Sequence, residues 1–365
     1  MLEDLRLDRL HSSFLRSGRG WEEFYVWAKD NRITPILYWQ AKHNPNRMPY
    51  PQWLFDKLKD HYTQNSIRNL VLLQEAECIW SQLETANIQA IPLKGVVLAT
   101  TVYPDPALRP FSDIDFLIRK SDLAVVKRIL LDEGYCAVPA LRNGFAEDYT
   151  NTVSFVRETP GFPIVIEVHW HLLYFPTYVP FLKIHEFWTS AQAGQINNCE
   201  VLTLKPEYHL VQLCLHYYLH AACYLIWLID IALFVNKHGS VINWTEVVRI
   251  AQRFRIEEAV DQVLSAASST FGLTIPVPQS DMNRRGFDLH MTALRMISRS
   301  PDHTGLASLL NLLFIPKLAD KLYFFAATLF PQNPGRTASF AGLMRKLRRA
   351  TGELARLPAW PTYKF

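Results

Sequence analysis

The chain has 365 residues, of which 49% are hydrophobic and 20% charged, and its formal net charge is +4 at pH 7. This length allows a large core divided into two or three subdomains, and the composition is that of an ordinary soluble globular protein. The five cysteines are scattered and show no CxxC spacing, which excludes a disulfide framework and a zinc ribbon and favours a reducing, cytoplasmic location.

Two features argue against export and membrane insertion. The N-terminus begins with acids and has no charged-then-apolar leader, so we expect no secretory signal. The longest apolar run, Ala221 to Val235, has 15 residues and contains Asp230. It is too short and too polar to span a bilayer, so we expect no transmembrane segment and a buried helix instead. Asp230 needs a partner in such a helix, either His216 or an arginine.

Residues 1–87 are predicted to form an N-terminal helical region. An amphipathic segment opens with Trp21 and Phe24, and Pro51 leads a longer helix that runs to about Thr85. The proline-containing stretch from Asn44 to Pro51 separates the two segments.

Residues 88–175 show a different pattern, in which short strands alternate with short helices. A turn at Lys94-Gly95 is expected to lead into a brief helix, and a turn at Pro160-Gly161 is expected to join two strands. Strands are predicted over residues 88–93, 114–118, 135–138, 152–156 and 164–170. The sequence therefore predicts an α+β fold, with a small mixed sheet embedded between N-terminal and C-terminal helical regions.

The remaining chain is predicted to be helical, as a C-terminal helical domain over residues 176–335 and a basic tail helix over residues 336–365. The tail holds seven Lys and Arg residues against the single acid Glu353. A solvated helix face is the default interpretation, and binding to triphosphate, an acidic acceptor, nucleic acid or a membrane surface is the alternative. Aromatic residues do not interleave with the basic ones, so nucleic acid is not the expected partner.

The segment Ser112-Asp113-Ile114-Asp115-Phe116 carries the strongest chemical signal, a DxD motif on a predicted strand. Side chains alternate along a strand, so Asp113 and Asp115 lie on one face, roughly 7 Å apart, while Ile114 and Phe116 point into a core. Two acids held in this way repel each other unless a cation lies between them.

A later strand contributes a third carboxylate. Alternation places Glu167, His169 and His171 on one face of the predicted strand, and a glutamate among Ile and Val residues is costly to bury unless it is paired or bound to a metal. Asp113, Asp115 and Glu167 are therefore predicted to hold Mg²⁺ or Mn²⁺, since hard cations prefer oxygen ligands. Such a site suits phosphoryl transfer.

Phosphate-binding residues are predicted beside these acids. Glycine at position 95 permits close approach of the backbone to a phosphate, and a turn entering a helix offers free N–H donors, so Lys94 and Gly95 are assigned to this role. Arg109 and Ser112 are assigned to the same site, although a surface loop is the alternative place for Arg109.

Histidines offer a second kind of metal site. His169 and His171, with Glu167, form a set that a transition metal accepts. His216 and His220 have the i, i+4 spacing of a zinc-protease helix, but Tyr217 stands where the general-base glutamate belongs. We therefore expect His216 and His220 to be core histidines with backbone partners.

The order of these motifs along the chain resembles the uncharacterised nucleotidyltransferase family of the polymerase β-like nucleotidyltransferase superfamily. The likeness extends from the N-terminal half to about residue 275. It rests on Leu93-Lys94-Gly95, Arg109, Ser112 to Ile118, Gly134-Tyr135, Glu167 to Trp170, His216, Leu228 to Ala232 and Trp244.

The resemblance implies that the small mixed sheet is a nucleotidyltransferase core. Asp113 and Asp115 match the paired metal-binding acids of the superfamily, Glu167 matches the third carboxylate, and Gly95 matches the glycine of the phosphate-binding turn. That turn usually contains Gly-Ser or Gly-Gly, whereas Val96 follows Gly95 here. Either Lys94 takes the role of the missing hydroxyl, or the donor is not an NTP. The family also suggests a peptide as acceptor.

Three functions follow from these residues. The leading hypothesis is a Mg²⁺-dependent enzyme that moves a nucleotidyl group from an NTP to a hydroxyl or phosphate of an acceptor, with Glu167 or Asp115 helping to deprotonate that acceptor. The alternative is transfer of a hexose from a nucleotide-sugar to a peptide, phosphopeptide or saccharide, with the same acids chelating the metal. A third hypothesis is a non-catalytic binding protein.

Overall fold

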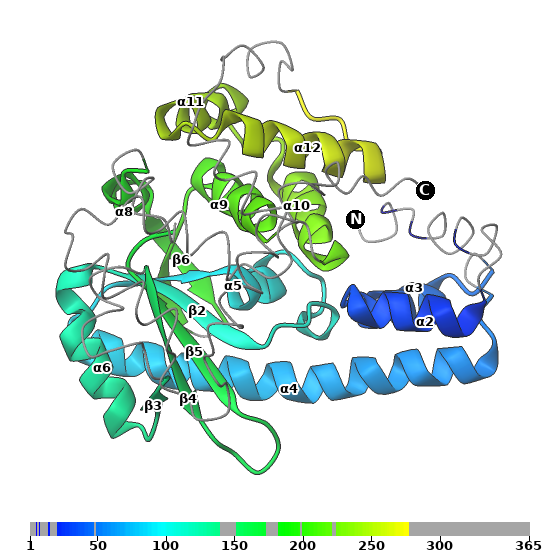
Figure 1. Cartoon of the computed structure of the whole chain (residues 1–365), viewed down its shortest axis with the longest axis horizontal. Coiled ribbons are helices and arrows are strands. Elements are labelled where there is room, and N and C mark those ends of the chain that lie inside the picture. The colour runs from blue at the N-terminus through cyan, green and yellow to red at the C-terminus, as the bar shows by residue number, and fades with distance from the viewer. Residues whose placement is uncertain are drawn as a thin grey trace, which may run out of the picture.

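The computed structural model describes residues 5, 7, 14, 20–46, 49–138, 151–172, 182–197, 199–220 and 224–276. Over these residues the chain forms a mixed sheet with helices on both sides (Figure 1). The predicted α+β class is confirmed, with the sheet between N-terminal and C-terminal helices. The basic tail, residues 336–365, lies outside the described residues.

The sheet has five strands in the order β1-β2-β5-β4-β3. The strand β2, second from the edge, pairs antiparallel with β1 and parallel with the central strand β5. The turn predicted near Pro160-Gly161 joins β4 and β5 as an antiparallel hairpin. The strand bounds are β1 Ala90–Leu93, β2 Asp113–Ile118, β3 Cys136–Ala137, β4 Thr152–Arg157 and β5 Ile164–His169.

The alternation of side chains on β2 divides two hydrophobic layers. Ile114, Phe116 and Ile118 are fully buried against the helix α4 (Gln52–Thr85). Leu117, which lies on the opposite face with the two aspartates, packs into the core made by the C-terminal helices. Each face of the strand is therefore covered, and the acids lie between the sheet and the C-terminal helices.

The helix α4 has 34 residues and supports both halves of this arrangement (Figure 1). Its C-terminal part packs under the sheet, where the rings of Trp80 and Phe116 lie 5.8 Å apart. Its N-terminal part packs against α3 (Thr34–His43), with the Tyr38 and Phe55 rings 5.3 Å apart. One helix thus fixes the N-terminal region relative to the sheet.

The predicted first amphipathic segment is divided into two helices, α2 (Trp21–Asp30) and α3. The chain turns at Arg32, which has a φ of 60°, in the left-handed region. Asn31 stabilises the turn, because its Nδ2 donates to Trp27 O and its Oδ1 accepts from Leu225 N at 3.1 Å, across 194 residues of sequence.

The C-terminal region consists of a helix, a hairpin and four further described helices. The β6–β7 hairpin was not predicted, and it turns at Asn197, which has a φ of 49°. The bounds are α8 Ile184–Ser190, β6 Gln192–Ile196, β7 Cys199–Thr203, α9 Pro206–Leu219, α10 Leu225–His238, α11 Trp244–Phe254 and α12 Glu257–Phe271.

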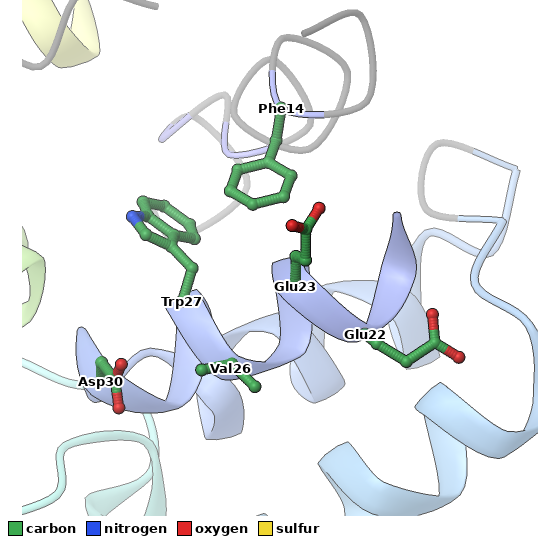
Figure 2. Close-up of a pocket in the computed structure, with 6 residues that line it drawn as sticks. All are labelled: Phe14, Glu22, Glu23, Val26, Trp27 and Asp30. Atoms are coloured by element: carbon green, nitrogen blue, oxygen red, sulfur yellow. The ribbon is translucent and has the colours of Figure 1, made fainter. Parts of the chain in front are cut away.

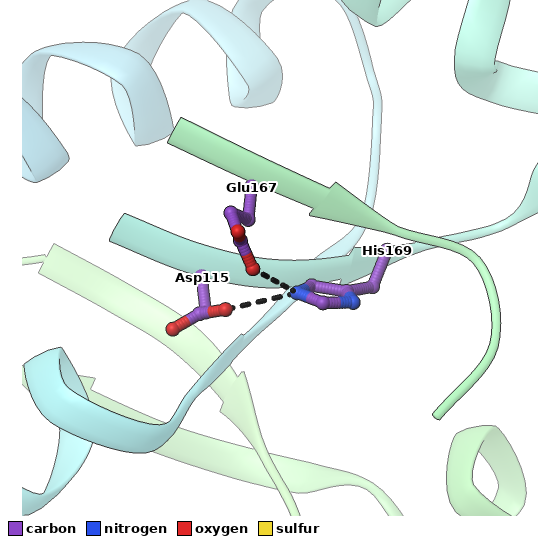
Figure 3. Close-up of side chains that lie close together, drawn as sticks. All are labelled: Asp115, Glu167 and His169. Atoms are coloured by element: carbon purple, nitrogen blue, oxygen red, sulfur yellow. Dashed lines mark hydrogen bonds and ion pairs between the residues drawn. The ribbon is translucent and has the colours of Figure 1, made fainter. Parts of the chain in front are cut away.

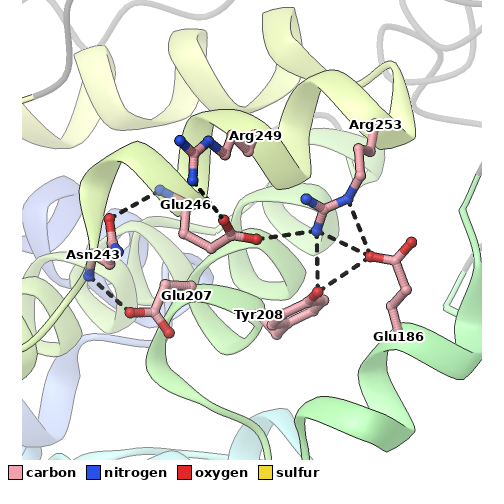
Figure 4. Close-up of polar contacts among 7 residues, drawn as sticks. All are labelled: Glu186, Glu207, Tyr208, Asn243, Glu246, Arg249 and Arg253. Carbon is pink, nitrogen blue, oxygen red and sulfur yellow. Dashed lines mark hydrogen bonds and ion pairs between the residues drawn. The ribbon is translucent and has the colours of Figure 1, made fainter.

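A polar network joins three of these helices at the surface (Figure 4). Arg253 of α11 donates to Glu186 of α8 at 3.0 Å and to Glu246 at 3.1 Å, and the Tyr208 hydroxyl of α9 bonds to Glu186 at 3.2 Å. Exposed ion pairs of this kind contribute little stability, so the network orients α8 more than it stabilises the fold.

Residues 225–235 of the predicted apolar run lie in α10, as expected, and this helix is buried in the hydrophobic core. Among the described residues, none of the helices has the length and apolar character needed to cross a membrane.

Candidate active site

The parallel pairing of β2 and β5 brings two acids together on one face of the sheet. Asp115 is the register partner of Glu167, and His169 follows two residues later on the same face. His169 Nε2 lies 2.9 Å from Asp115 Oδ1 and 3.5 Å from Glu167 Oε2 (Figure 3). One ligand atom from each residue lies within 4.8 Å of the other two.

Lys94 completes this cluster from the other neighbour of β2. It directly follows β1 and is the first residue of the helix α5 (Lys94–Thr101). The turn predicted at Lys94-Gly95 is therefore the first turn of this helix. Its φ of 52° is in the left-handed region, which costs a non-glycine residue about 1–2 kcal/mol. In this position its Nζ lies 2.6 Å from Asp115 Oδ1 and 3.9 Å from Glu167 Oε2.

The charges within the cluster stabilise one another. Burial raises the pKa of Asp115, but Lys94 and His169 outweigh burial and hold it well below its usual range. Burial and the charge of Lys94 lower the pKa of His169, whereas its hydrogen bonds to Asp115 and Glu167 raise it. The hydrogen bonds have the larger effect, so the pKa of His169 is raised overall. Asp115 is therefore ionised at neutral pH, and His169 is favoured in its protonated form.

Asp113 lies on the same side of β2 but outside the three-residue cluster. Burial raises its pKa to about 6, and repulsion from Asp115 and Glu167 adds to this shift. The neighbouring Ser112 hydroxyl donates to Asp113 Oδ1 at 3.5 Å. Burial is therefore the main reason that the Asp113 carboxyl keeps its proton to a higher pH, and the two neighbouring carboxylates contribute to the shift.

A divalent cation fits this donor set. Two carboxylates of adjacent strands, Asp115 and Glu167, offer oxygen ligands of the kind that Mg²⁺ and Mn²⁺ prefer. His169 would add an imidazole ligand on losing its proton, because only the neutral ring binds a metal. Asp115 and Glu167 also add to the raised pKa of Asp113 by repulsion, and a cation between the carboxylates would reduce that repulsion. His171 is not part of the set, because its Nε2 bonds to Leu182 O at 2.9 Å.

Arg109 is directed into the protein interior. Its side chain is 4% exposed and forms an ion pair with Asp230 of α10, in which Nη2 and Oδ2 are 2.6 Å apart. Its Nε also donates to Asp230, its Nη1 donates to Pro110 O, and the Tyr103 hydroxyl donates to Asp230 Oδ1 at 2.7 Å. The arginine partner predicted for Asp230 is thus Arg109, and its guanidinium is occupied by the fold rather than open to a phosphate.

Gly95 permits a close approach between α5 and the segment before β2. A Cβ atom at this position would lie 2.5 Å from the Cβ of Phe111. Asn69 of α4 holds the same segment, since its Nδ2 donates to Pro106 O at 2.7 Å and to Arg109 O at 2.9 Å. These contacts fix the start of β2 and therefore the position of the acids.

His216 of α9 faces the carboxylate cluster from the opposite layer. Its ring packs edge-on against Trp227 at 4.5 Å and His220 at 4.6 Å. Burial lowers its pKa well below the usual value, and the charge of Lys94 lowers it further. His216 is thus a neutral imidazole within electrostatic range of Lys94 and Asp115.

Sequence reasoning placed Asp113, Asp115, Glu167 and His169 on the correct faces of their strands but did not anticipate the contact of Lys94 with Asp115. A signal for His169 was present in its spacing from Glu167. The Lys94 contact had no such signal, because it depends on the antiparallel pairing of β1 with β2.

Comparison with known proteins gave two matches. A family model described as an uncharacterised nucleotidyltransferase matches residues 17–272. No curated protein matches the sequence. Among solved structures, the chain is similar to an antigenic nucleotidyltransferase-like protein from Paracoccidioides brasiliensis, with 15% identity and a TM-score of 0.37 over 60% of this chain and 97% of that one.

Proposed function

The chain belongs to the uncharacterised nucleotidyltransferase family, and from this membership we propose that it transfers a nucleotidyl group from an NTP to a hydroxyl or phosphate of an acceptor, with Mg²⁺ or Mn²⁺ as cofactor. The observation that carries the proposal is the opposition of Asp115 and Glu167 across paired strands, with Lys94 Nζ 2.6 Å from Asp115. A peptide is the acceptor that we propose to test first.

Asp115 and Glu167 would hold the metal, with Asp113 and His169 beside them. A bound divalent cation would neutralise charge that develops on the phosphates and acidify the acceptor hydroxyl. The Lys94 ammonium lies beside both acids that would hold the metal. When the metal binds, Lys94 would exchange its contact with Asp115 for a phosphate oxygen of the donor. Gly95 would act indirectly, because the space of its missing Cβ is filled by Phe111 and this contact fixes the start of β2.

The reaction forms a bond between the acceptor oxygen and the α-phosphorus and breaks the bond from that phosphorus to the pyrophosphate oxygen. Pyrophosphate leaves with the bonding electron pair, and the acceptor proton passes to a carboxylate. Glu167 is the better base, because its side chain is 29% exposed whereas Asp115 is 2% exposed and already accepts from Lys94.

The free cysteines support our proposal of a cytoplasmic location. Cys78, Cys136, Cys199 and Cys214 are all unbridged, and these are the cysteines that lie within the described residues. Reduced thiols are typical of a reducing compartment.

The test is calorimetric titration of the full chain with each NTP, in Mg²⁺ and in EDTA, followed by mass analysis of candidate acceptors. We expect metal-dependent NTP binding that Asp115→Asn or Glu167→Gln weakens at least tenfold. The matched control is Glu200→Gln, which removes an exposed acid from β7 and should leave binding unchanged.

The product mass separates the chemistries. Nucleotidyl transfer adds a base-containing phosphate, and glycosyl transfer from a nucleotide-sugar adds only a sugar. Metal-dependent binding that is undiminished in both acid variants would refute the assignment of the metal site.

A further inference from the structure

A cavity of about 540 Å³ lies between α3, α4 and the turn that precedes β5. Its volume is within the range of small-molecule sites. Lys29, Arg32 and Arg68 contribute three cations to its lining, and His61 lies beside them. No acid lines it. The cavity is therefore a basic one, and none of its lining residues belongs to the Lys94, Asp115, Glu167 and His169 cluster.

Within the part of the chain that the structure describes, none of these three cations forms an ion pair with an acid, although Asp113 acts on Arg68 from a longer distance. Arg68 stacks over the Phe162 ring at 4.5 Å, and Arg32 stacks over the Tyr224 ring at 4.2 Å. Ring stacking holds a guanidinium in place and leaves its planar N–H edge available. Burial lowers the pKa of Arg68, the Asp113 carboxylate raises it in part, and the charge of Arg32 lowers it again. Two like charges are thus held within range of each other, an arrangement that a bound anion stabilises.

A second cavity shows the opposite character. It has a volume of about 420 Å³ and lies along α2, with three acids, Glu22, Glu23 and Asp30, around the aromatic rings of Phe14 and Trp27 (Figure 2). An anion would be repelled there, so basic lining is not a general property of the N-terminal helices.

The basic cavity adjoins the start of β2. Pro110, three residues before Asp113, lines it, and the Asp113 carboxylate is close enough to raise the pKa of Arg68. Phe162, in the turn before β5, lies on the side of β2 away from β1. Lys94 lies on the β1 side. Positive charge is therefore placed on both sides of the acids at the start of β2.

We propose that this cavity binds a phosphate group of the acceptor, while the Lys94 side of β2 holds the phosphates of the donor. Three cations match a phosphate dianion better than a carboxylate, and guanidinium groups bind phosphate oxygens in pairs. The identification of the ligand as the acceptor rests on the proposed function, whereas the anion site itself depends only on the geometry of the cavity.

The first experiment measures binding of inorganic phosphate to the full chain by calorimetry in EDTA, with acetate in parallel. Arg68→Gln and Arg32→Asn should each weaken phosphate binding about tenfold or more, since each removes a charge-assisted contact. Asparagine suits position 32 because it tolerates a left-handed φ, which is 60° here. The control is Lys59→Gln, which removes an exposed lysine of α4, the helix that carries Arg68, at a position outside the cavity. It should leave the phosphate affinity within twofold of the wild type.

A loss in Lys59→Gln equal to that in the arginine variants would overturn the site, because it would show only a general charge effect. Acetate that binds as tightly as phosphate would overturn the choice of phosphate. Unchanged phosphate binding in both arginine variants would refute the cavity as the binding place.

The second experiment separates acceptor from donor. Mg²⁺-NTP is titrated into protein saturated with phosphate, and we expect its affinity to stay within twofold. Mutual exclusion would place the phosphate in the donor site and overturn the proposal. If Mg²⁺-NTP does not bind while the arginine-dependent phosphate site persists, the proposed function fails and the anion site stands.

Discussion

The buried ion pair between Arg109 and Asp230 gives the clearest prediction of stability. Asp230→Ala removes the acceptor of four hydrogen bonds, one from the Tyr103 hydroxyl at 2.7 Å, two from Arg109 Nε at 2.8 and 3.0 Å, and one from Arg109 Nη2 at 2.6 Å. The guanidinium stays buried without its counter-ion, and removal of one partner of such a pair costs about 3–5 kcal/mol. Since domains are stable by about 5–15 kcal/mol, the variant should remain folded but with a small margin.

The assay is urea unfolding followed by circular dichroism, with the free energy of unfolding compared between the wild type and Asp230→Ala. A triple variant, Tyr103→Phe with Arg109→Met and Asp230→Leu, removes every polar side chain of the cluster. It should return to within about 2 kcal/mol of the wild type, because apolar replacement of a buried pair is often close to neutral. A cost below about 1 kcal/mol for Asp230→Ala alone would refute the reasoning.

Two further predictions concern the start of β2. The pKa of Asp113 rises from 3.8 to about 6 on folding, chiefly by burial, so its contribution to stability is complete below about pH 4 and is lost as pH rises through about 6. The loss amounts to about 3 kcal/mol. In EDTA, Asp113→Asn should therefore be more stable than the wild type at pH 8 in urea titrations, and parallel pH profiles of the two proteins would contradict this. Gly95→Ala should destabilise the chain by about 1–3 kcal/mol, because the new Cβ would lie 2.5 Å from Phe111 Cβ. The control is Gly161→Ala, where nothing lies within 4 Å of the added Cβ, and an equal change in melting temperature for both variants would show that the contact is unimportant.

The parts of the fold that the sequence predicted are those with a local signal. The helix expected from Pro51 to about Thr85 is α4 (Gln52–Thr85), because its apolar spacing is sustained over many turns. The strands β2 and β5 were found from alternation, and the turn at Pro160-Gly161 predicted the hairpin of β4 and β5. These features are specified by neighbouring residues and need no knowledge of the tertiary structure.

The parts that were missed depend on contacts between distant segments. Lys94 reaches Asp115 only because β1 pairs antiparallel with β2 and because Lys94 adopts a left-handed conformation. The basic cavity combines Arg32, Arg68 and Phe162 from three separate segments, and no spacing in the sequence relates them. The break between α2 and α3 likewise depends on Asn31, whose side chain binds the backbone of Leu225.

The contact between Asn31 and Leu225 can form only late in the synthesis of the chain. The two residues are 194 positions apart, and at about 5–20 residues per second the ribosome needs about 10–40 s to pass from the first to the second. Helix–coil relaxation takes roughly a microsecond or less, so α2 and α3 can form long before α10 exists. Throughout that interval, the turn between them lacks the partner that fixes it in the finished protein.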